Sequence, residues 1–312
     1  MKAGRHHPIM RKALLCFAAL LFTALVLTEP LAIGQETTIR VRVQLVNILA
    51  TVRDHVGTLA PDLTKDDFIL LDEGQPQEIK VFDRQAGTPL AITMLVDSSG
   101  STAKDLKFEQ DSAAKFLHAL VRKQDRVALY SFNQDVDEIR AFTNDPVSLE
   151  RGLREIHPAG GTSLYDAIFL ASNELRRLQG RRVIILVTDG DDTTSRINYH
   201  QALHAAQDAD IAIYSVIVVP ILSEAGRDIG GEHALITLSG DTGGRAYQPR
   251  VATDLDPAFA DLARELRTQY LLGFYAQPMR DAKDFRHLEV KCKNPTFTVQ
   301  ARKGYYFRND RP

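Results

Sequence analysis

The strongest constraint on the fold is the alternation of continuous apolar runs with helical hydrophobic periods between residues 90 and 268. The runs show no apolar–polar alternation, which is typical of strands covered on both faces in a parallel sheet. Between them, apolar residues such as Leu164, Ile168 and Leu175 recur on one face of a helix. This order predicts a doubly wound α/β fold with a mostly parallel sheet, whose ligands bind at the carboxyl ends of the strands. The predicted strands are 91–96, 127–132, 183–187 and 211–219.

Both flanks of this region change to a hydrophobic period of two, which is typical of half-buried strands. In the N-terminal flank, the Asp72-Glu73-Gly74 turn is expected to join strands at 68–71 and 79–82 into a hairpin. Each flank is close to the smallest size that folds alone, so we expect the two to form one small β-sandwich around an inserted α/β domain. The expected divisions are a signal peptide at 1–34, β segments at 35–88 and 269–312, and the α/β domain at 89–268.

The first 34 residues have the pattern of a secretory signal peptide. Four basic residues precede an apolar run at 13–27, and this run is shorter than the roughly 20 residues that a membrane span needs. Small residues then suit cleavage before Gln35. Cleavage would remove Cys16 and leave Cys292 without a disulfide partner. We therefore expect a secreted or periplasmic protein without a membrane span after cleavage, and the alternative is an uncleaved membrane anchor.

Composition excludes several classes of function. The chain has 38 Lys and Arg against 40 Asp and Glu, whereas a nucleic-acid binder normally has a basic excess. Two cysteines are too few for a disulfide scaffold or a thiolate zinc cluster. The sequence has no GxSxG elbow and no GxxxxGK[ST] loop, so esterase and NTPase functions lack their essential residues.

Three polar segments are predicted at one edge of the parallel sheet. Asp97, Ser99 and Ser101 follow the first strand, Thr162 precedes a helix, and Asp189 follows the third strand. Two carboxylates and three hydroxyls, without His or Cys, are the donors of a hard cation, so Mg²⁺ is expected, with Mn²⁺ or Ca²⁺ as alternatives. Two carboxylates roughly neutralise a divalent ion and leave it able to accept a carboxylate from another molecule. The first segment alone is also typical of a helix N-cap.

The same five residues carry a resemblance to a known family. They follow the pattern DxSxS, then T, then D, which resembles the metal-ion-dependent adhesion site (MIDAS) of the von Willebrand factor type A domain. The flanking segments LVNILATVRDHVGTLAPDLTKDDFILLDEG, VFD and RKGYYF look like the acidobacterial-type family of secreted VWFA-related proteins. The resemblance implies that the two aspartates act partly through water, while the hydroxyls bind the metal directly.

The expected function is protein binding in adhesion or scaffolding, not catalysis. The metal would capture an acidic side chain of a partner protein, and residues near Ser163, 133–137 and 191–196 would set specificity. No nucleic-acid partner is expected. The first alternative is a metal-assisted hydrolase, for which Asp191 or Asp192 is the only candidate base. The second is a structural envelope module in which the metal only rigidifies the loops.

Overall fold

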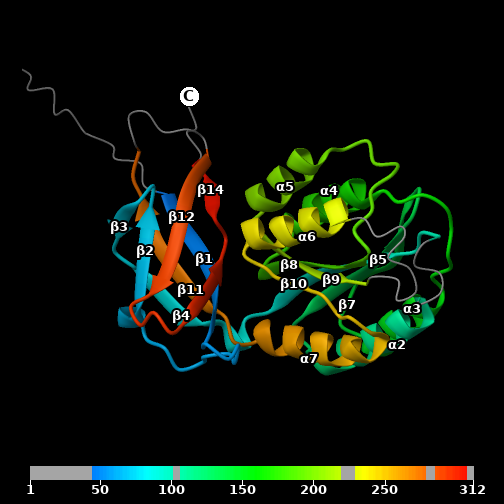
Figure 1. The fold of residues 1–312 in the computed structure, drawn as a ribbon, viewed down its shortest axis with the longest axis horizontal. Coiled ribbons are helices and arrows are strands. Elements are labelled where there is room, and N and C mark those ends of the chain that lie inside the picture. The colour runs from blue at the N-terminus through cyan, green and yellow to red at the C-terminus, as the bar shows by residue number, and fades with distance from the viewer. Residues whose placement is uncertain (1–43, 101–105, 219–228, 279–284, 308–312) are drawn as a thin grey trace, which may run out of the picture. The chain divides into compact units, whose positions relative to one another are not determined.

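The computed structural model describes most of the α/β region and both β flanks (Figure 1). The predicted signal peptide at 1–34 lies outside the described residues, and so does Ser101. The predicted fold class is confirmed, because a mostly parallel sheet with helices on both faces is accompanied by antiparallel sheets from the two flanks. The described residues are 44–100, 106–218, 229–278 and 285–307.

The central sheet has six strands in the order β10-β9-β8-β5-β6-β7. Neighbouring strands are parallel except for β6 and β7, which pair antiparallel at one edge. The four inner strands are the predicted apolar runs, and every residue of β5 and β9 is buried. The bounds are β5 (Leu90–Asp97), β6 (Arg126–Phe132), β7 (Val136–Thr143), β8 (Arg181–Thr188), β9 (Ile211–Ile217) and β10 (Ala246–Tyr247).

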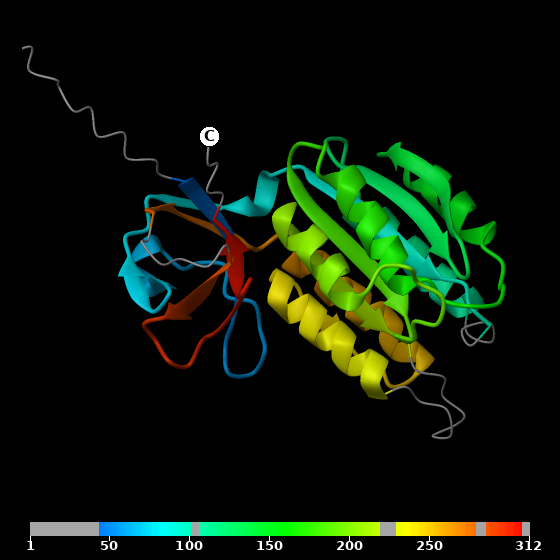
Figure 2. The same ribbon diagram turned by 90° about the horizontal axis from the view of Figure 1, so that it is seen from above.

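Helices cover both faces of this sheet (Figures 1 and 2). Alternate residues of β5 point to opposite faces, so Ile92 and Met94 join one core with α2, α3 and α7, while Leu95 joins the other with α4, α5 and α6. No helix within the described ranges is long and apolar enough to cross a membrane. The bounds are α2 (Leu106–Leu120), α3 (Pro146–Arg154), α4 (Leu164–Leu175), α5 (Tyr199–Asp208), α6 (Ile229–Thr242) and α7 (Leu255–Glu265), with short 3-10 helices at Lys65–Asp67, Gln85–Gly87 and Ala252–Asp254.

Strands from the two flanks combine in two four-stranded antiparallel sheets: they alternate in β13-β1-β11-β4, whereas β14-β12-β2-β3 joins a C-terminal pair to an N-terminal pair. The N-terminal β1 lies between the C-terminal β11 and β13, and β2 pairs with β12. Each sheet therefore needs strands from both flanks, and residues of both sheets share one hydrophobic core. The bounds are β1 (Gln44–Arg53), β2 (Phe68–Asp72), β3 (Gln75–Gln77), β4 (Val81–Arg84), β11 (Tyr270–Ala276), β12 (Phe285–Cys292), β13 (Thr298–Ala301) and β14 (Gly304–Tyr306).

The predicted return strand of the first hairpin, at 79–82, is wrong. Glu73 and Gly74 have φ values of 49° and 75°, and positive φ at both central residues is typical of a type I′ two-residue turn. The return strand β3 therefore starts at Gln75, and the chain then crosses to the other sheet, where β4 pairs with β11. The left-handed Glu73 is held by its Oε1 atom, which accepts a hydrogen bond from the backbone N–H of His287 at 2.6 Å.

A buried polar network joins β1 to the α/β region. The Glu265 side chain, at the end of α7, is completely buried and forms an ion pair with Arg53 at 2.7 Å. Its carboxylate also accepts hydrogen bonds from Thr51 at 3.2 Å and from the Tyr247 hydroxyl at 3.0 Å. Arg53 forms a second ion pair, with Asp261 at 2.7 Å. These contacts fix the end of α7 against β1.

Candidate metal centre

Hydrogen bonds between backbone groups bring the three predicted loops together. The backbone N–H of Ala159 donates to the carbonyl of Ser98 at 2.7 Å, in the loop after β5. The backbone N–H groups of Thr193 and Thr194, in the loop after β8, donate to the carbonyl of Thr162 at 2.9 and 3.0 Å. The segment before α4 therefore contacts both loops that carry the predicted aspartates.

Asp97 is the most enclosed of the predicted ligands that the structure describes. It is the last residue of β5 and is completely buried. Its Oδ1 atom accepts from the backbone N–H of Ser99 at 2.8 Å, and its Oδ2 atom accepts from the Thr188 hydroxyl at 2.6 Å. Burial, reinforced by the charge of nearby Asp189, raises the pKa of Asp97 to about 6, although hydrogen bonds from Thr188 and Ser99 act in the opposite direction. A cation would relieve this unfavourable charge.

Thr162 is buried and lies next to Ser163, the N-cap residue of α4. Its backbone N–H donates to the Thr193 hydroxyl at 2.9 Å, which holds it against the loop after β8. Gly161 precedes it with φ of 76°, and a Cβ there would lie 3.2 Å from side-chain atoms of Gln134 and Thr194. A glycine is therefore needed for the turn that places Thr162 beside the loop after β8.

Ser163 fixes this turn in place. Its hydroxyl donates to the carbonyl of Gln134 at 2.8 Å and lies 2.7 Å from the Thr194 hydroxyl. The sequence predicted that residues near Ser163 set the specificity of the site. In the structure Ser163 also joins the segment before α4 to the loops that contain Gln134 and Thr194. A hollow of about 430 Å³ opens here, lined by Gln134, Asp135, Val136, Ser163, Asp166, Thr194 and Arg196.

The acidic residues after β8 have different surroundings. Asp189 is half-buried, and its Oδ1 atom accepts from the backbone N–H of Asp191 at 3.3 Å. Asp192 turns instead toward α4, where its Oδ1 atom accepts from the Ser195 hydroxyl at 2.6 Å and from the backbone N–H of Tyr165 at 3.3 Å. Asp192 thus helps to anchor the start of α4. These contacts give it a structural role without any function as a catalytic base.

Sequence reasoning missed Thr188, which lies beneath the site. It is the last residue of β8 and is completely buried. Its hydroxyl donates to Asp97 and accepts a hydrogen bond from the backbone N–H of Gly190 at 3.1 Å, so it links the two loops that carry the predicted aspartates. The available signal was a hydroxyl residue at the carboxyl end of an otherwise apolar strand, directly before Asp189.

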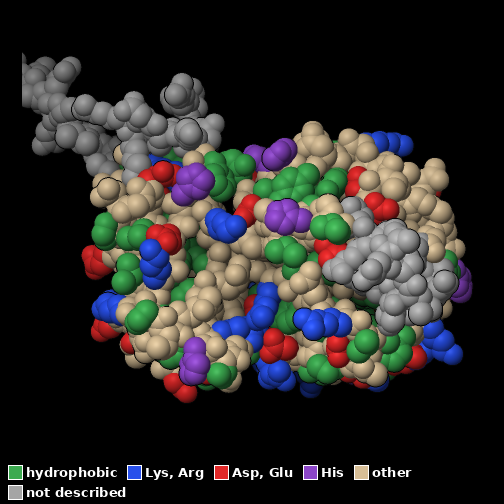
Figure 3. All heavy atoms as spheres, in the orientation of Figure 1, with side chains coloured by type: hydrophobic (Ala, Val, Ile, Leu, Met, Phe, Trp, Pro, Cys, Tyr) green, Lys and Arg blue, Asp and Glu red, His purple; other side chains and the backbone are tan. Residues whose placement is uncertain are grey.

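The donor chemistry fits a hard divalent cation. Among the described residues, Asp97, Ser99, Thr162 and Asp189 come from the converging loops and offer carboxylate and hydroxyl oxygens. Groups of three or more His, Cys, Asp or Glu arranged for a metal are not found in the described part of the chain. On the face shown in Figure 3, basic and acidic side chains are interspersed, unlike the basic stripe that is typical of a nucleic-acid binder.

Comparison with known proteins bears on the α/β region. Residues 92–191 match the family model of the von Willebrand factor type A domain. A relative from Sus scrofa, inter-alpha-trypsin inhibitor heavy chain H4, is 31% identical over 122 residues, which are 35% of this chain. The chain spans only 13% of the length of that relative.

Two solved structures are similar to this chain at low sequence identity. Proximal thread matrix protein 1 from the mussel byssus, described with a zinc-occupied MIDAS motif, has a TM-score of 0.51 at 13% identity, over 64% of this chain and 50% of that one. An aerotolerance-related membrane protein from Bacteroides fragilis NCTC 9343 has a TM-score of 0.46 at 20% identity, over 57% of this chain and 98% of that one. The matched sequence segment and the fold together assign residues 92–191 to the von Willebrand factor type A domain.

Proposed function

We propose that this chain is a secreted or periplasmic protein-binding module that captures an acidic side chain of a partner protein through Mg²⁺. The proposed ligands are Asp97, Ser99, Ser101, Thr162 and Asp189. When bound, the ion would supply an electrophilic position that a carboxylate from outside can occupy. Mn²⁺ and Ca²⁺ are the alternative ions, and the chain itself is proposed to be a binding protein without catalytic activity.

The observation that carries this proposal is the buried carboxylate of Asp97 next to a second carboxylate, that of Asp189. The raised pKa of Asp97, about 6, reflects the free-energy cost of a buried negative charge near another one. A divalent cation would compensate both charges at once, whereas a monovalent ion would compensate only one. Hydroxyl ligands add no charge, so such a cation would keep its attraction for an external carboxylate.

The surroundings of the site also support a macromolecular partner. The hollow beside Ser163 has Arg196, Asp135 and Asp166 on its wall, so it offers both charges to residues that flank an inserted acidic side chain. The mussel protein with a zinc-occupied MIDAS motif is a precedent for metal at such a motif in this fold. Zn²⁺ therefore belongs in any test of ion preference.

The hydrolase alternative has weaker support. Of its two candidate bases, Asp192 already accepts two hydrogen bonds at the start of α4. Asp191 lies one residue closer to the proposed metal ligand Asp189, and its own backbone N–H donates to that residue. The structural-module alternative differs in its outcome: the metal would stabilise the fold, but no partner would depend on it.

A selection of peptide ligands tests the proposal. Immobilised residues 35–312 are offered a displayed random-peptide library in millimolar Mg²⁺, and bound peptides are eluted with EDTA. We expect the eluted peptides to share an Asp or Glu whose replacement by Asn or Gln abolishes binding. The Asp97→Ala variant should retain none of them. Asp66→Ala, which removes an exposed carboxylate from the β flank, should retain all of them.

Two results would contradict the proposal. Peptides that remain bound in EDTA would show that capture does not use a metal. Peptides whose acidic residue can be changed to an amide without loss would show that the metal does not coordinate it.

A further inference from the structure

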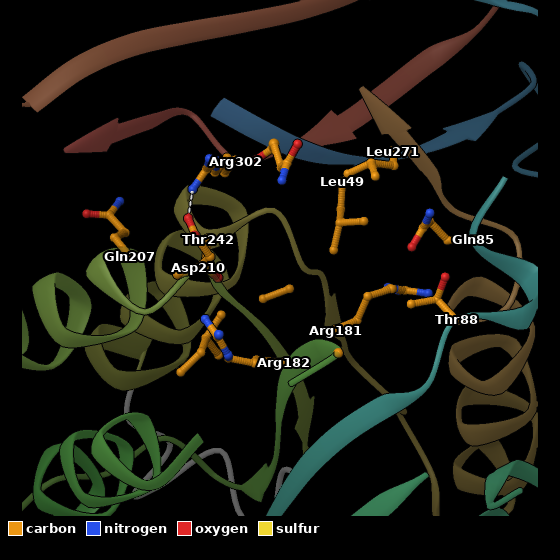
Figure 4. Close-up of a pocket in the computed structure, with 14 residues that line it drawn as sticks. Leu49, Gln85, Thr88, Arg181, Arg182, Gln207, Asp210, Thr242, Leu271 and Arg302 are labelled. Atoms are coloured by element: carbon orange, nitrogen blue, oxygen red, sulfur yellow. Dashed lines mark hydrogen bonds and ion pairs between the residues drawn. The ribbon is translucent and has the colours of Figure 1, made fainter. Parts of the chain in front are cut away.

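A cavity of about 300 Å³ lies at the other end of the central sheet from the candidate metal centre (Figure 4). It is formed where β8 and β9 begin, whereas Asp97 and Thr188 lie where β5 and β8 end. Leu49 of β1 and Leu271 of β11, which are directly paired across these strands, form part of its wall. Ile211 and Ala212 add apolar surface from β9. The cavity is therefore built jointly by the α/β region and the flanking strands.

The lining of this cavity carries an excess of positive charge. It includes three guanidinium groups, from Arg181, Arg182 and Arg302, and one carboxylate, that of Asp210. Arg302 and Asp210 form an ion pair (Figure 4). Arg182 donates instead to backbone carbonyls, those of Leu178 at 3.0 Å and Ala209 at 2.7 Å. Arg181 and Arg182 thus lie beside the apolar wall, and the lining holds no carboxylate that pairs with either of them.

Arg181 is the deepest of these charges, with an exposed fraction of only 6%. It donates to the carbonyl of Leu266 at 2.8 Å and to the side-chain oxygen of Gln269. Its Nε–H has no acceptor within the described ranges, and no carboxylate described there lies within 4.0 Å of its guanidinium nitrogens. Figure 4 shows the side chain extending along the cavity toward Thr88 and Gln85.

Burial lowers the pKa of Arg181 to about 10, although the charges of Asp125 and Glu265 act in the opposite direction. Those two carboxylates form ion pairs with Arg267 and Arg53 instead, so Arg181 has no direct carboxylate partner among the described residues. A carboxylate offers both missing components: negative charge, and two oxygens in a geometry that matches adjacent guanidinium N–H groups. Leu49 and Leu271 provide the surface against which a hydrocarbon group can pack. The volume is at the lower end for small-molecule pockets, so it suits one small molecule and not a folded partner.

We propose that this cavity binds a small organic carboxylate, whose carboxylate pairs with Arg181 and whose hydrocarbon part packs against Leu49 and Leu271. This second site is independent of the proposed metal centre, since the two lie at opposite ends of the sheet. Its ligand would contact β1, β8 and β11 together and would stabilise their mutual arrangement.

Thermal unfolding and calorimetry of residues 35–312 in EDTA test this site. The probes are hexanoate, octanoate and benzoate, each beside its primary amide, with inorganic phosphate as a further anion. EDTA prevents binding of the acids to a metal. We expect at least one acid to raise the unfolding temperature in a concentration-dependent way, while its amide and phosphate do not. Asp97→Ala should bind the acid as well as the unmodified chain does.

Variants in the cavity complete the test. Arg181→Met should raise the dissociation constant of the acid at least about tenfold, because a charge-assisted hydrogen bond is lost. Leu49→Trp should abolish binding by filling the cavity, even where the Arg181 variant fails to fold. Leu45→Trp, on the same face of β1 but outside the cavity lining, is the matched control.

The proposal is overturned by any of four results. No acid raises the unfolding temperature; the amides bind as tightly as the acids; phosphate binds as tightly as the acids; or Leu49→Trp binds the acid unchanged. The second result would exclude pairing with Arg181, and the third would exclude a role for the apolar wall.

Discussion

The Thr188 hydroxyl shows how one buried side chain can tune a charged site. It donates to Asp97 at 2.6 Å and thereby favours the ionised form of that carboxylate, in opposition to burial. It also accepts a hydrogen bond from Gly190, the residue directly after Asp189. The Thr188 hydroxyl oxygen thus fixes both the orientation of Asp97 and the backbone next to Asp189.

Replacement of Thr188 should therefore weaken metal binding without removing a proposed ligand. Thr188→Val keeps the shape but loses the hydroxyl, so we expect Mg²⁺ affinity to fall about tenfold, the loss of roughly one hydrogen bond to a charged group. Thr188→Ser keeps the hydroxyl and should stay close to the unmodified chain. Isothermal titration with Mg²⁺ measures both, and equal affinities for the valine and serine variants would contradict this role.

The raised pKa of Asp97 predicts a specific dependence of stability on pH. In the metal-free folded chain this pKa is about 6, above the value of 3.8 for an unperturbed aspartate, so the folded state binds the proton more tightly. Protonated Asp97 therefore stabilises the folded state relative to the unfolded state. This contribution to the free energy of unfolding is complete below pH 4 and is lost as the pH rises through about 6. It amounts to about 3 kcal/mol in the free energy of unfolding at full loss.

Denaturant unfolding in EDTA at pH 4 and pH 7 measures this effect. The Asp97→Asn variant cannot ionise at this position, so its free energy of unfolding should fall less between these two pH values than that of the unmodified chain. Equal changes in the two proteins would contradict the assignment. With Mg²⁺ present, affinity should weaken below about pH 6, since protons compete with the metal for the carboxylate.

At the scale of elements, the connection from α6 to β10 leaves no room for a side chain. A Cβ on Gly244 would lie 1.9 Å from the carbonyl oxygen of Ile213 in β9. Gly244→Ala should therefore destabilise the chain by about 3 kcal/mol or prevent folding, because β9 and β10 would have to separate. Gly87→Ala is the control, since a Cβ there would meet nothing within 4 Å. Urea unfolding that gives equal stabilities would contradict this packing.

The elements that sequence reasoning found are those with a continuous pattern. β5, β6, β8 and β9 each contain a mostly apolar central run, because the sheet is covered on both faces. The edge strand β7 mixes exposed and half-buried residues, so it shows no clear period. The helix α5 buries three small alanines and Gln207, so its apolar face is weak. The helix α6 has a weak apolar pattern because it contains Gly230, Gly231 and Gly240.

The candidate site was predictable in part for a related reason. Aspartates directly after apolar runs mark strand ends, and parallel strands bring those ends to one edge. The role of Thr188 was not predictable in this way, since its hydroxyl contacts Asp97 across two strands that are separated by 91 positions in the chain. The turn at Asp72-Glu73-Gly74 was predicted, but its return strand was placed too late in the chain, because a residue other than glycine rarely adopts the left-handed conformation that Glu73 has in this tight turn.

At the scale of the molecule, we propose that residues 35–88 and 269–312 form one β domain, and that the α/β domain at 89–268 is inserted in the sequence between its two halves. Its link to the end of α7 depends on Arg53 and Glu265, whose carboxylate is completely buried. Arg53→Met should cost about 3–5 kcal/mol, because a buried charge would lose its partner. The double variant Arg53→Met/Glu265→Gln should recover part of that stability. Denaturant unfolding compares the three, and a neutral Arg53→Met would contradict the importance of this link.

The most direct test of the metal centre is thermal unfolding of residues 35–312 in EDTA and then in millimolar Mg²⁺, Mn²⁺, Ca²⁺ or Zn²⁺. An ion that binds only the folded state adds about 2.7 kcal/mol of stability at a hundredfold excess over its Kd. We predict that Mg²⁺ raises the unfolding temperature of the unmodified chain and of Asp66→Ala, but not that of Asp97→Ala. No rise with any of the four ions, or an equal rise in Asp97→Ala, would contradict a metal-dependent binding function.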